Sequence, residues 1–457
     1  MLSIGFDAAR CSGLADQVRP RSLTTIRENS VNMDGFQYSR DELHCEDVPA
    51  ASLAARFGTP LYVYSRSALT QRLEDLRQAF RAARPLICYS VKANSNSSIL
   101  RLLAQANAGF DIVSGGELFR VLKAGGAPSK IVFAGVGKTP DEIAAALRAG
   151  IHMFNVESEA ELSAIDAAAA RIGRIANVAL RLNPNVDART HTKTSTGRKE
   201  DKFGIDLPMA RDLFANRAHY SHLEIAGVHL HLGSPLYSVA PIRRALLKVR
   251  RFIREVRELG ARPRTLNVGG GYCISYDGRK VIQPADYAAV ILPFAREMGL
   301  QLLLEPGRYI VGNSAVLLSR VTYVKEGWAG RKFVIIDAAM NDLIRPALYG
   351  SYHHIWPVRG PVTPLLGARG RAAAETNLET MDIVGPICET SDCFARDRRL
   401  PPMKSGDLLA IFGAGAYGMA MSSTYNSRPR AAEVLVNGGK TQQIRKRESY
   451  RDLIRGE

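Results

Sequence analysis

The sequence predicts an α/β protein, a (β/α)8 barrel followed by a C-terminal all-β domain, and three observations lead to this fold class. Apolar segments of strand length alternate with alanine- and leucine-rich amphipathic segments from residue 86 to residue 305. Eight such units in about 250 residues fit the size of a barrel. Beyond residue 312 strand-like segments continue without long amphipathic partners, and 457 residues are too many for one compact core.

Taken in order, residues 1–32 mix acids with arginines and lack sustained periodicity, so we expect a disordered leader or an upstream extension. Residues 33–60 are expected to form a lead-in strand and a helix at 48–57 that Gly58 ends, joining the β domain. The barrel is expected over 61–311 and the β domain over 312–457. The predicted barrel strands are 86–92, 110–114, 131–134, 152–156, 178–183, 227–232, 265–268 and 302–305, with helices such as 140–149 and 158–172 between them. The predicted strands of the β domain are 315–324, 332–336, 381–384 and 408–412.

The first predicted barrel strand ends on Lys92, directly before a polar run at 94–98. At the mouth of a buried strand an ammonium group is partly desolvated. We therefore expect a lowered pKa for Lys92 and an amine free to form a Schiff base with an aldehyde cofactor or a carbonyl substrate. Considered alone, this segment is better explained by a strand-end lysine that reaches solvent, and the groups at the other strand ends reverse that preference.

Polar and glycine residues follow the other predicted strands at their carboxyl ends, where the chemistry of a barrel collects. They are Asp111, Arg181, Asn183, His231, Ser234, Gly269, Gly270, Gly271, Glu305, Gly307 and Arg308. The glycine run could close its N–H groups on a phosphate, with Ser234 and Arg308 as further donors. Glu305 could pair with a protonated ring nitrogen, and His231 could stack on a pyridine face. Each residue alone has an ordinary structural role, but together they predict a site for a phosphorylated pyridine aldehyde.

Charge and composition exclude several other classes of protein. The net charge of +17 raises the question of nucleic acid, but much of it lies at 243–264 on the polar face of an amphipathic helix, and no nucleic-acid motif accompanies it. We expect no nucleic-acid partner.

No apolar run approaches the roughly 18 residues of a membrane helix, so no membrane partner is expected either. The six cysteines are scattered, which favours a reduced cytoplasm, and His229 with His231 lacks a third metal ligand, so no metal is expected.

Several motifs resemble those of the barrel-fold, PLP-dependent amino acid decarboxylases, where PLP is pyridoxal 5'-phosphate. These motifs are YSVKAN at 89–94, HLHLGS at 229–234, NVGGGY at 267–272, EPGR at 305–308, GPICE at 385–389 and GAYG at 415–418. Within that family the chain most resembles the diaminopimelate decarboxylases, through 183–187, 195–197, 202–205, 341–349 and the run MSSTYNSRPRAAEVLV at 421–436. The resemblance extends from about Met33 to the C-terminus.

The resemblance implies a PLP-binding, TIM-like barrel and the conversion of meso-2,6-diaminopimelate to L-lysine and carbon dioxide, the last step of lysine biosynthesis. It implies that Lys92 carries the cofactor, His231 stacks on its ring and Glu305 faces its nitrogen. The other implied cofactor-binding residues are Asp111, Ser234, Gly269, Gly270, Gly271, Gly307, Arg308 and Tyr417. The implied substrate-binding residues are Arg308, Arg345, Tyr349, Glu389 and Tyr417, and Cys388 matches the catalytic proton donor.

Two other functions stay open at this point. An ornithine- or arginine-type basic amino acid decarboxylase would act on a substrate whose distal group is only cationic, and Arg345 would repel such a tail. A non-catalytic PLP-binding homologue is disfavoured because Lys92, Cys388 and Glu305 are all retained. The resemblance also implies a cytoplasmic homodimer with shared active sites, in which Cys388 and Glu389 of one chain reach the Lys92 of the other.

Overall fold

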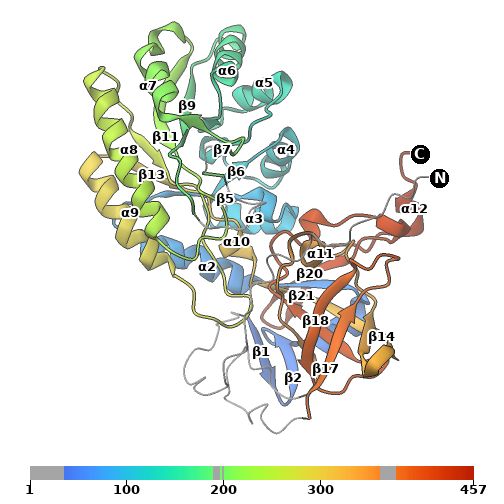
Figure 1. Cartoon of the computed structure of the whole chain (residues 1–457). Helices are drawn as coiled ribbons and strands as arrows, with labels where there is room; N and C mark the ends of the chain where they lie inside the picture. Colours follow the sequence, from blue (N-terminus) through green and yellow to red (C-terminus); the bar gives the residue numbers. More distant parts are fainter. Residues whose placement is uncertain (1–34, 189–195, 198–199, 361–376) are drawn as a thin grey trace, which may run out of the picture.

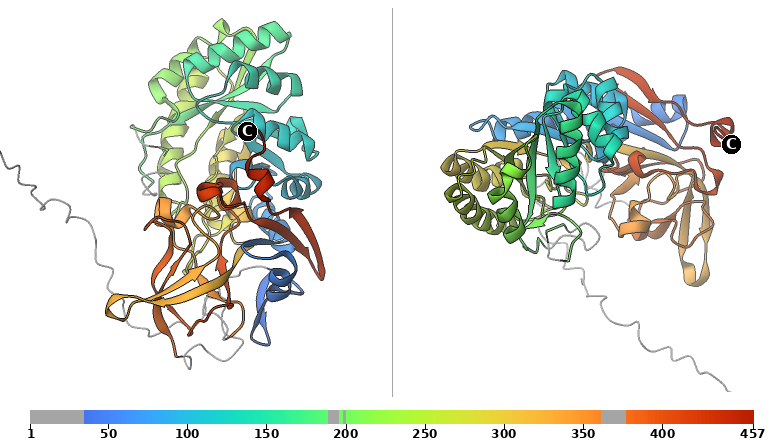
Figure 2. Two further views of the ribbon diagram at one scale, coloured as in Figure 1. Left: turned by 90° about the vertical axis from the view of Figure 1, so that its right-hand side faces the viewer. Right: turned by 90° about the horizontal axis from the view of Figure 1, so that it is seen from above.

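The computed structural model describes residues 35–188, 196–197, 200–360 and 377–457 of the chain. Figure 1 shows a barrel of strands and helices beside a second, mostly β body, and Figure 2 shows the same two bodies from two further sides. The segment 1–32, expected to be a leader or extension, lies outside the described residues.

Eight parallel strands close the barrel in the order β9-β11-β12-β13-β5-β6-β7-β8, and β8 pairs with β9. They are β5 (Leu86–Ser90), β6 (Gly109–Ile112), β7 (Ile131–Phe133), β8 (Met153–Val156), β9 (Ala176–Asn183), β11 (Leu223–His229), β12 (Thr265–Asn267) and β13 (Gln301–Leu304). The short β10 (Ile205–Asp206) adds to β9. Each predicted barrel strand overlaps one of the eight, so the barrel prediction is confirmed.

Helices cover the outside of the barrel (Figure 1). They are α2 (Arg66–Ala79), α3 (Ser97–Gln105), α4 (Gly115–Lys123), α5 (Pro140–Ala149), α6 (Glu159–Ile172), α7 (Leu207–Ala215), α8 (Ala240–Glu258) and α9 (Pro284–Met298), whereas the short α10 (Arg308–Val311) is buried. Ser114, Thr139 and Ser158 cap α4, α5 and α6 by accepting an N–H of the first turn, which starts these helices soon after the preceding strands. The basic helix α8 buries its apolar stripe and leaves its arginines outside, as predicted. None of the described helices is long and apolar enough to cross a membrane.

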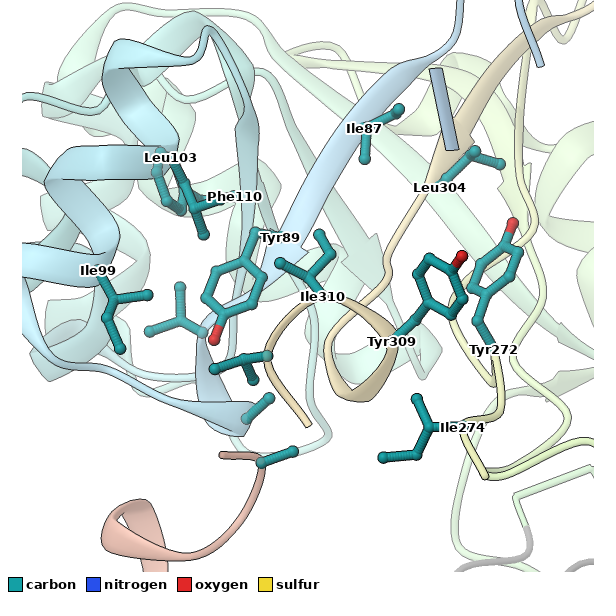
Figure 3. Close-up of a cluster of buried hydrophobic side chains, with 14 of the residues drawn as sticks. Ile87, Tyr89, Ile99, Leu103, Phe110, Tyr272, Ile274, Leu304, Tyr309 and Ile310 are labelled. Carbon is teal, nitrogen blue, oxygen red and sulfur yellow. The ribbon is translucent and has the colours of Figure 1, made fainter. Parts of the chain in front are cut away.

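The hydrophobic core fixes the strand ends that carry the polar groups. Cys88, Val132, Met153, Ala179 and Leu303 form a small buried cluster contributed by five barrel strands. A larger core lies between strands and helices, and Figure 3 shows α10 residues Tyr309 and Ile310 within it, near Tyr89, Tyr272 and Ile274. Because α10 is buried over its whole length, the start of this helix is held rigidly beside β13.

The second body is built on one nine-stranded sheet with the order β18-β17-β15-β14-β4-β20-β21, while β19 joins β14 and β16 joins β19. Its strands are β4 (Leu61–Ser65), β14 (Ala315–Glu326), β15 (Lys332–Ile336), β16 (Ile355–Pro357), β17 (Glu379–Val384), β18 (Cys393–Leu400), β19 (Leu408–Phe412), β20 (Ala432–Asn437) and β21 (Lys440–Arg445). The four predicted strands correspond to β14, β15, β17 and β19. The domain also contains the short helices α11 (Arg345–Tyr349) and α12 (Tyr450–Leu453).

The lead-in segment differs from its predicted form in two details. It forms a small sheet of β1 (Phe36–Ser39), β2 (Glu42–Cys45) and β3 (Val48–Pro49), followed by α1 (Ala50–Phe57), which ends at Gly58. The helix starts later than predicted because Val48 pairs with Cys45. In addition, β4 pairs with β14 and β20, so residues 61–65 belong to the second sheet although the barrel was expected from residue 61.

A buried carboxylate joins the two bodies next to Lys92. Glu433 of β20 is fully buried and accepts hydrogen bonds from the Tyr64 hydroxyl at 2.7 Å, from Asn96 Nδ2 at 2.8 Å and from Arg445. Asn94 Nδ2 donates to the Tyr64 hydroxyl at 3.0 Å. Asn94 and Asn96 follow the 3-10 turn that carries Lys92, so this network fastens the Lys92 segment to the second sheet.

Glu433→Gln should lower the free energy of unfolding by about 1–3 kcal/mol, because buried donors lose a charged acceptor. Denaturant unfolding followed by circular dichroism measures this change. Glu379→Gln is the matched control: it breaks the part-exposed pair with Lys332, whose atoms lie 2.7 Å apart, and should cost less than about 1 kcal/mol. Equal losses in the two variants would contradict the special role of the Glu433 network.

Candidate active site

A cavity of about 310 Å³ lies at the carboxyl ends of the barrel strands. The predicted site residues that line it are Lys92, His231, Ser234, Gly270, Gly271, Glu305, Gly307, Arg308 and Tyr417. Asp111 and Gly269 do not line the cavity, but each bonds to its wall, Asp111 to Lys92 and Gly269 to Glu305. Arg181 lines the cavity as well, whereas Asn183 does not, so the structure brings together all but one of the strand-end residues predicted from sequence.

Lys92 is held by an acid from the neighbouring strand. Its Nζ lies 2.7 Å from Oδ2 of the fully buried Asp111, which also accepts from the Ser90 hydroxyl at 2.6 Å. Burial acts to lower the pKa of Lys92, but the carboxylate of Asp111 outweighs it, with help from Tyr417 and Glu305, and the pKa is raised. The predicted fall in pKa is therefore wrong, because the lysine is paired with a carboxylate and its side chain is 40% exposed.

Glu305 follows β13 and is buried among polar groups. Its Oε1 accepts hydrogen bonds from Asn155 Nδ2 at 2.8 Å and Asn267 Nδ2 at 2.6 Å, and His229 Nε2 lies 3.3 Å from its Oε2. Burial would raise the pKa of Glu305, yet His229, Lys92 and the Asn267 amide together hold it well below its usual value. The carboxylate is thus ionised and fixed in orientation.

His231 is kept neutral beside Glu305. Burial, then the charges of Arg181 and Lys92, hold the pKa of His231 well below its ordinary value. The backbone N–H of Gly270 donates to His231 Nδ1 at 3.2 Å, so Nδ1 is the unprotonated nitrogen of the ring. Arg181 itself is paired with the buried Glu157 at 2.6 Å, and its Nη2 meets no partner among the described residues.

Donors suited to an anion also line the inner cavity. Arg308 Nε lies 3.4 Å from the Ser234 hydroxyl, and Arg308 Nη1 donates to the Tyr276 hydroxyl at 2.7 Å. Within the described part of the chain the N–H of Gly271 has no acceptor, whereas those of Gly269 and Gly270 donate to side chains. Of the three glycines, Gly271 therefore has the N–H group that is available to an anion.

A second cavity of about 690 Å³ adjoins the first, since Thr196, His231, Ser234, Arg308 and Tyr417 line both. It also contains Arg345 and Tyr349, two of the predicted substrate-binding residues. Arg345 is buried, and its Nε donates to His353 Nε2 at 3.3 Å. Burial, followed by the charge of Arg345, lowers the pKa of His353 to about 3, so His353 stays a neutral acceptor that orients the guanidinium.

Cys388 and Glu389 lie outside both cavities. Cys388 is exposed, with its Sγ 3.2 Å from Asn426 Oδ1. Glu389 is also exposed and accepts hydrogen bonds from Tyr425 and, at 2.7 Å, from Ser391. Within one chain, these two predicted residues do not share the cavity of Lys92.

Asn155, Asn267 and Tyr276 belong to the site but were not predicted from the sequence. Asn155 and Asn267 stand at the carboxyl ends of predicted strands, so the same inspection of strand ends could have found them. Tyr276 follows the glycine run in an irregular loop, and nothing in its spacing marks it. Burial acts to raise its pKa, but Arg308 and Arg345 outweigh burial and lower it.

His353→Gln should weaken the loss of stability on acidification. With the pKa of His353 lowered to about 3, the unfolded chain binds a proton below pH 6.5 that the folded chain does not. The contribution of His353 is therefore complete above pH 6.5 and falls below it, by up to about 1.4 kcal/mol per pH unit. Urea unfolding of wild type and variant on both sides of pH 6.5 measures the difference in slope.

Ser351→Ala is the control for this experiment, because it removes another partner of Arg345, the hydroxyl 3.2 Å from Nη2, without removing a titrating group. It should shift stability equally at every pH. A His353→Gln slope identical to the wild-type slope would show that His353 takes up its proton equally in both states.

A protein-family match covers the barrel, and individual relatives match nearly the whole chain. Residues 66–312 match the family described as "Pyridoxal-dependent decarboxylase, pyridoxal binding domain". The diaminopimelate decarboxylase of Pseudomonas aeruginosa is 46% identical over 425 residues, which cover 93% of this chain and 99% of that protein.

Solved structures give the same result in three dimensions. The diaminopimelate decarboxylase of Helicobacter pylori complexed with L-lysine is 41% identical, with a TM-score of 0.82, and the match covers 89% of this chain and 98% of that one. The enzyme from M. jannaschii in co-complex with L-lysine is 37% identical, with a TM-score of 0.85, over 93% and 98% of the two chains. The likeness therefore spans both bodies of the fold.

Proposed function

The chain belongs to the diaminopimelate decarboxylases, a group of pyridoxal-dependent decarboxylases, and on this premise we propose that it converts meso-2,6-diaminopimelate to L-lysine and carbon dioxide with PLP as cofactor. The observation that carries the proposal is the pair of adjoining cavities, with Lys92 and Glu305 in one and Arg345 in the other. The reaction is the last step of lysine biosynthesis, and we place it in the cytoplasm.

The inner cavity has the groups that PLP requires. Lys92 offers an amine for the aldehyde, Glu305 an ionised carboxylate for the ring nitrogen, and His231 a neutral ring for stacking. Arg308, Ser234 and the free N–H of Gly271 offer donors for the phosphate. When bound, PLP supplies an electron sink for the pair left on the α-carbon as carbon dioxide departs.

The chain's own residues orient the reactants and move the protons. Asp111 holds the Nζ of Lys92 in place through the 2.7 Å contact. Glu305, fixed by two amides, can accept a hydrogen bond from a protonated ring nitrogen without turning. We assign to the thiol of Cys388 the proton that the α-carbon receives once the carboxyl group has left.

Arg345 supports diaminopimelate over ornithine or arginine. A buried guanidinium in the outer cavity can pair with the distal carboxylate of diaminopimelate, and it repels a substrate tail that is only cationic. Tyr349 lines the same cavity beside it. Glu389 would offer a charge for the distal ammonium group, provided that it reaches the site from another chain.

The purified protein with PLP should release carbon dioxide from meso-diaminopimelate and not from ornithine, as measured by gas release. Lys92→Ala is the control: it should lose both turnover and the visible absorption of bound PLP, because Lys92 is the one lysine among the described residues that line the inner cavity. Ornithine turnover equal to that of diaminopimelate would reject the substrate. A visible band that survives dialysis in Lys92→Ala would reject the role of Lys92.

We further propose that two chains complete each active site, with Lys92 from one and Cys388 and Glu389 from the other. Cys388 and Glu389 are exposed and line neither cavity of their own chain. The wall of the inner cavity includes Val113 and Val136, which are 37% and 43% exposed, so apolar surface there is available for a partner to cover. Two-fold symmetry would then give two equal sites.

Mixing Lys92→Ala with Cys388→Ala should restore activity although neither variant is active alone. Each hybrid dimer has one site with both wild-type residues, and random exchange makes about half of the dimers hybrid. About a quarter of the wild-type rate should therefore return, measured after mass analysis has verified exchange. Verified hybrids without activity would show that both residues act within one chain.

A further inference from the structure

The side chain of Asn267 makes hydrogen bonds to two neighbouring segments at the inner cavity, the glycine run and the segment of Glu305. Asn267 is the last residue of β12 and is fully buried. Its Oδ1 accepts the backbone N–H of Gly269 at 2.9 Å, and its Nδ2 donates to Glu305 Oε1 at 2.6 Å. One side-chain amide thus contacts both the glycine run and the buried acid.

On the glycine side, the bond to Asn267 sets the direction of the loop. Gly269 has a φ of +67°, and a Cβ there would lie 2.4 Å from the carbonyl oxygen of Leu230, so the turn has little room to shift. With the N–H of Gly269 held by Asn267 and that of Gly270 by His231, the N–H of Gly271 remains without an acceptor in the described residues. The loop is fixed in the form that presents this donor.

On the acid side, the same amide fixes one oxygen of Glu305. Asn155 donates to that oxygen as well, at 2.8 Å, so both amide donors converge on Oε1 and neither reaches Oε2. A backbone hydrogen bond from the N–H of Glu305 to the carbonyl of Gly269, at 2.8 Å, joins the same two segments as the side chain of Asn267. The glycine run and the carboxylate therefore form one hydrogen-bonded unit.

We propose that Asn267 is a positioning residue that sets the distance and orientation between the phosphate donors of the glycine run and the ring-nitrogen partner Glu305. The inference rests on the proposed function, since it assigns those two ends to PLP. A rigid ligand gains from both ends only when the two sets of partners are held at matching positions. Asn267 is placed to hold them because it bonds to both.

Asn155 is a natural comparison for Asn267. It is equally buried and donates to the same oxygen of Glu305, its Oδ1 accepts a long hydrogen bond from Asn267 Nδ2 at 3.5 Å, and it makes no bond to the glycine run. Replacing Asn155 removes one donor from the acid and the 3.5 Å contact with Asn267, but it leaves the bond from Gly269 to Asn267 in place. Replacing Asn267 removes a donor from the acid and also releases Gly269.

The test compares the affinity for PLP with that for pyridoxal, which lacks the phosphate, in wild type, Asn267→Ala and Asn155→Ala. The binding curves come from visible absorption and tyrosine fluorescence. The dissociation constant for pyridoxal divided by that for PLP is the ratio that reports how much the phosphate contributes to affinity. Asn155→Ala should weaken both ligands by the same factor and keep the wild-type ratio, whereas Asn267→Ala should reduce the ratio about tenfold.

Asn267→Val, which fills the space that alanine leaves empty and makes no side-chain hydrogen bond, repeats the loss and decides the question if the alanine variant does not fold. The inference is overturned if the Asn267 variants keep the wild-type ratio, if Asn155→Ala loses it equally, or if neither Asn267 variant folds. A wild-type protein that binds neither PLP nor pyridoxal would instead reject the proposed function, so the two failures are distinguishable.

Discussion

The hydrogen-bonded junction around Glu433 is the constraint on which the site depends. Lys92 belongs to the barrel, whereas Arg345 and Tyr417 belong to the second body, so the adjoining cavities keep their shape only if the two bodies do not move apart. Glu433, Tyr64, Asn94 and Asn96 provide that connection within a few residues of Lys92, and the N–H of Tyr417 donates to the carbonyl of Ala93 at 2.8 Å. Because these groups are buried, opening the junction would leave polar atoms without partners.

The charges of the inner cavity are arranged in pairs, and this pairing explains the protonation states. Asp111 pairs with Lys92 and Glu157 with Arg181, while the amides of Asn155 and Asn267 support Glu305. Positive charges near His231 add to the effect of burial and keep its pKa low. The neutral imidazole of His231 can then accept a hydrogen bond from the N–H of Gly270, and it does not compete with the cations for the carboxylates.

The barrel could be predicted because its sequence repeats regularly, whereas the contacts between distant segments could not be predicted. The barrel strands are continuous apolar runs, and capped helices separate them, so their positions follow from the sequence. In the second body, β18 contains four consecutive charged residues at 396–399 and β21 is largely polar, so neither shows the alternation expected of a strand. The sign of the Lys92 pKa shift depended on Asp111, whose neighbour in register is Ser90 on β5. Asp111 was recognised as a strand-end residue, but its pairing with Lys92 required the strand order.

Among the described residues that line the outer cavity, positive charges outnumber negative ones: four are cationic, and Asp277 is the one carboxylate. The guanidinium carbons of Arg308 and Arg345 lie 6.0 and 5.3 Å from the ring of Tyr276, and these cations outweigh burial to lower the pKa of its hydroxyl. A field that stabilises a phenolate also stabilises a carboxylate placed there. An amino acid with a second carboxylate at its far end would therefore enter with that end toward Arg345, and its other end would face Lys92 and Glu305. The positive charge around Arg345 therefore supports the proposed class of substrate and the proposed direction of binding.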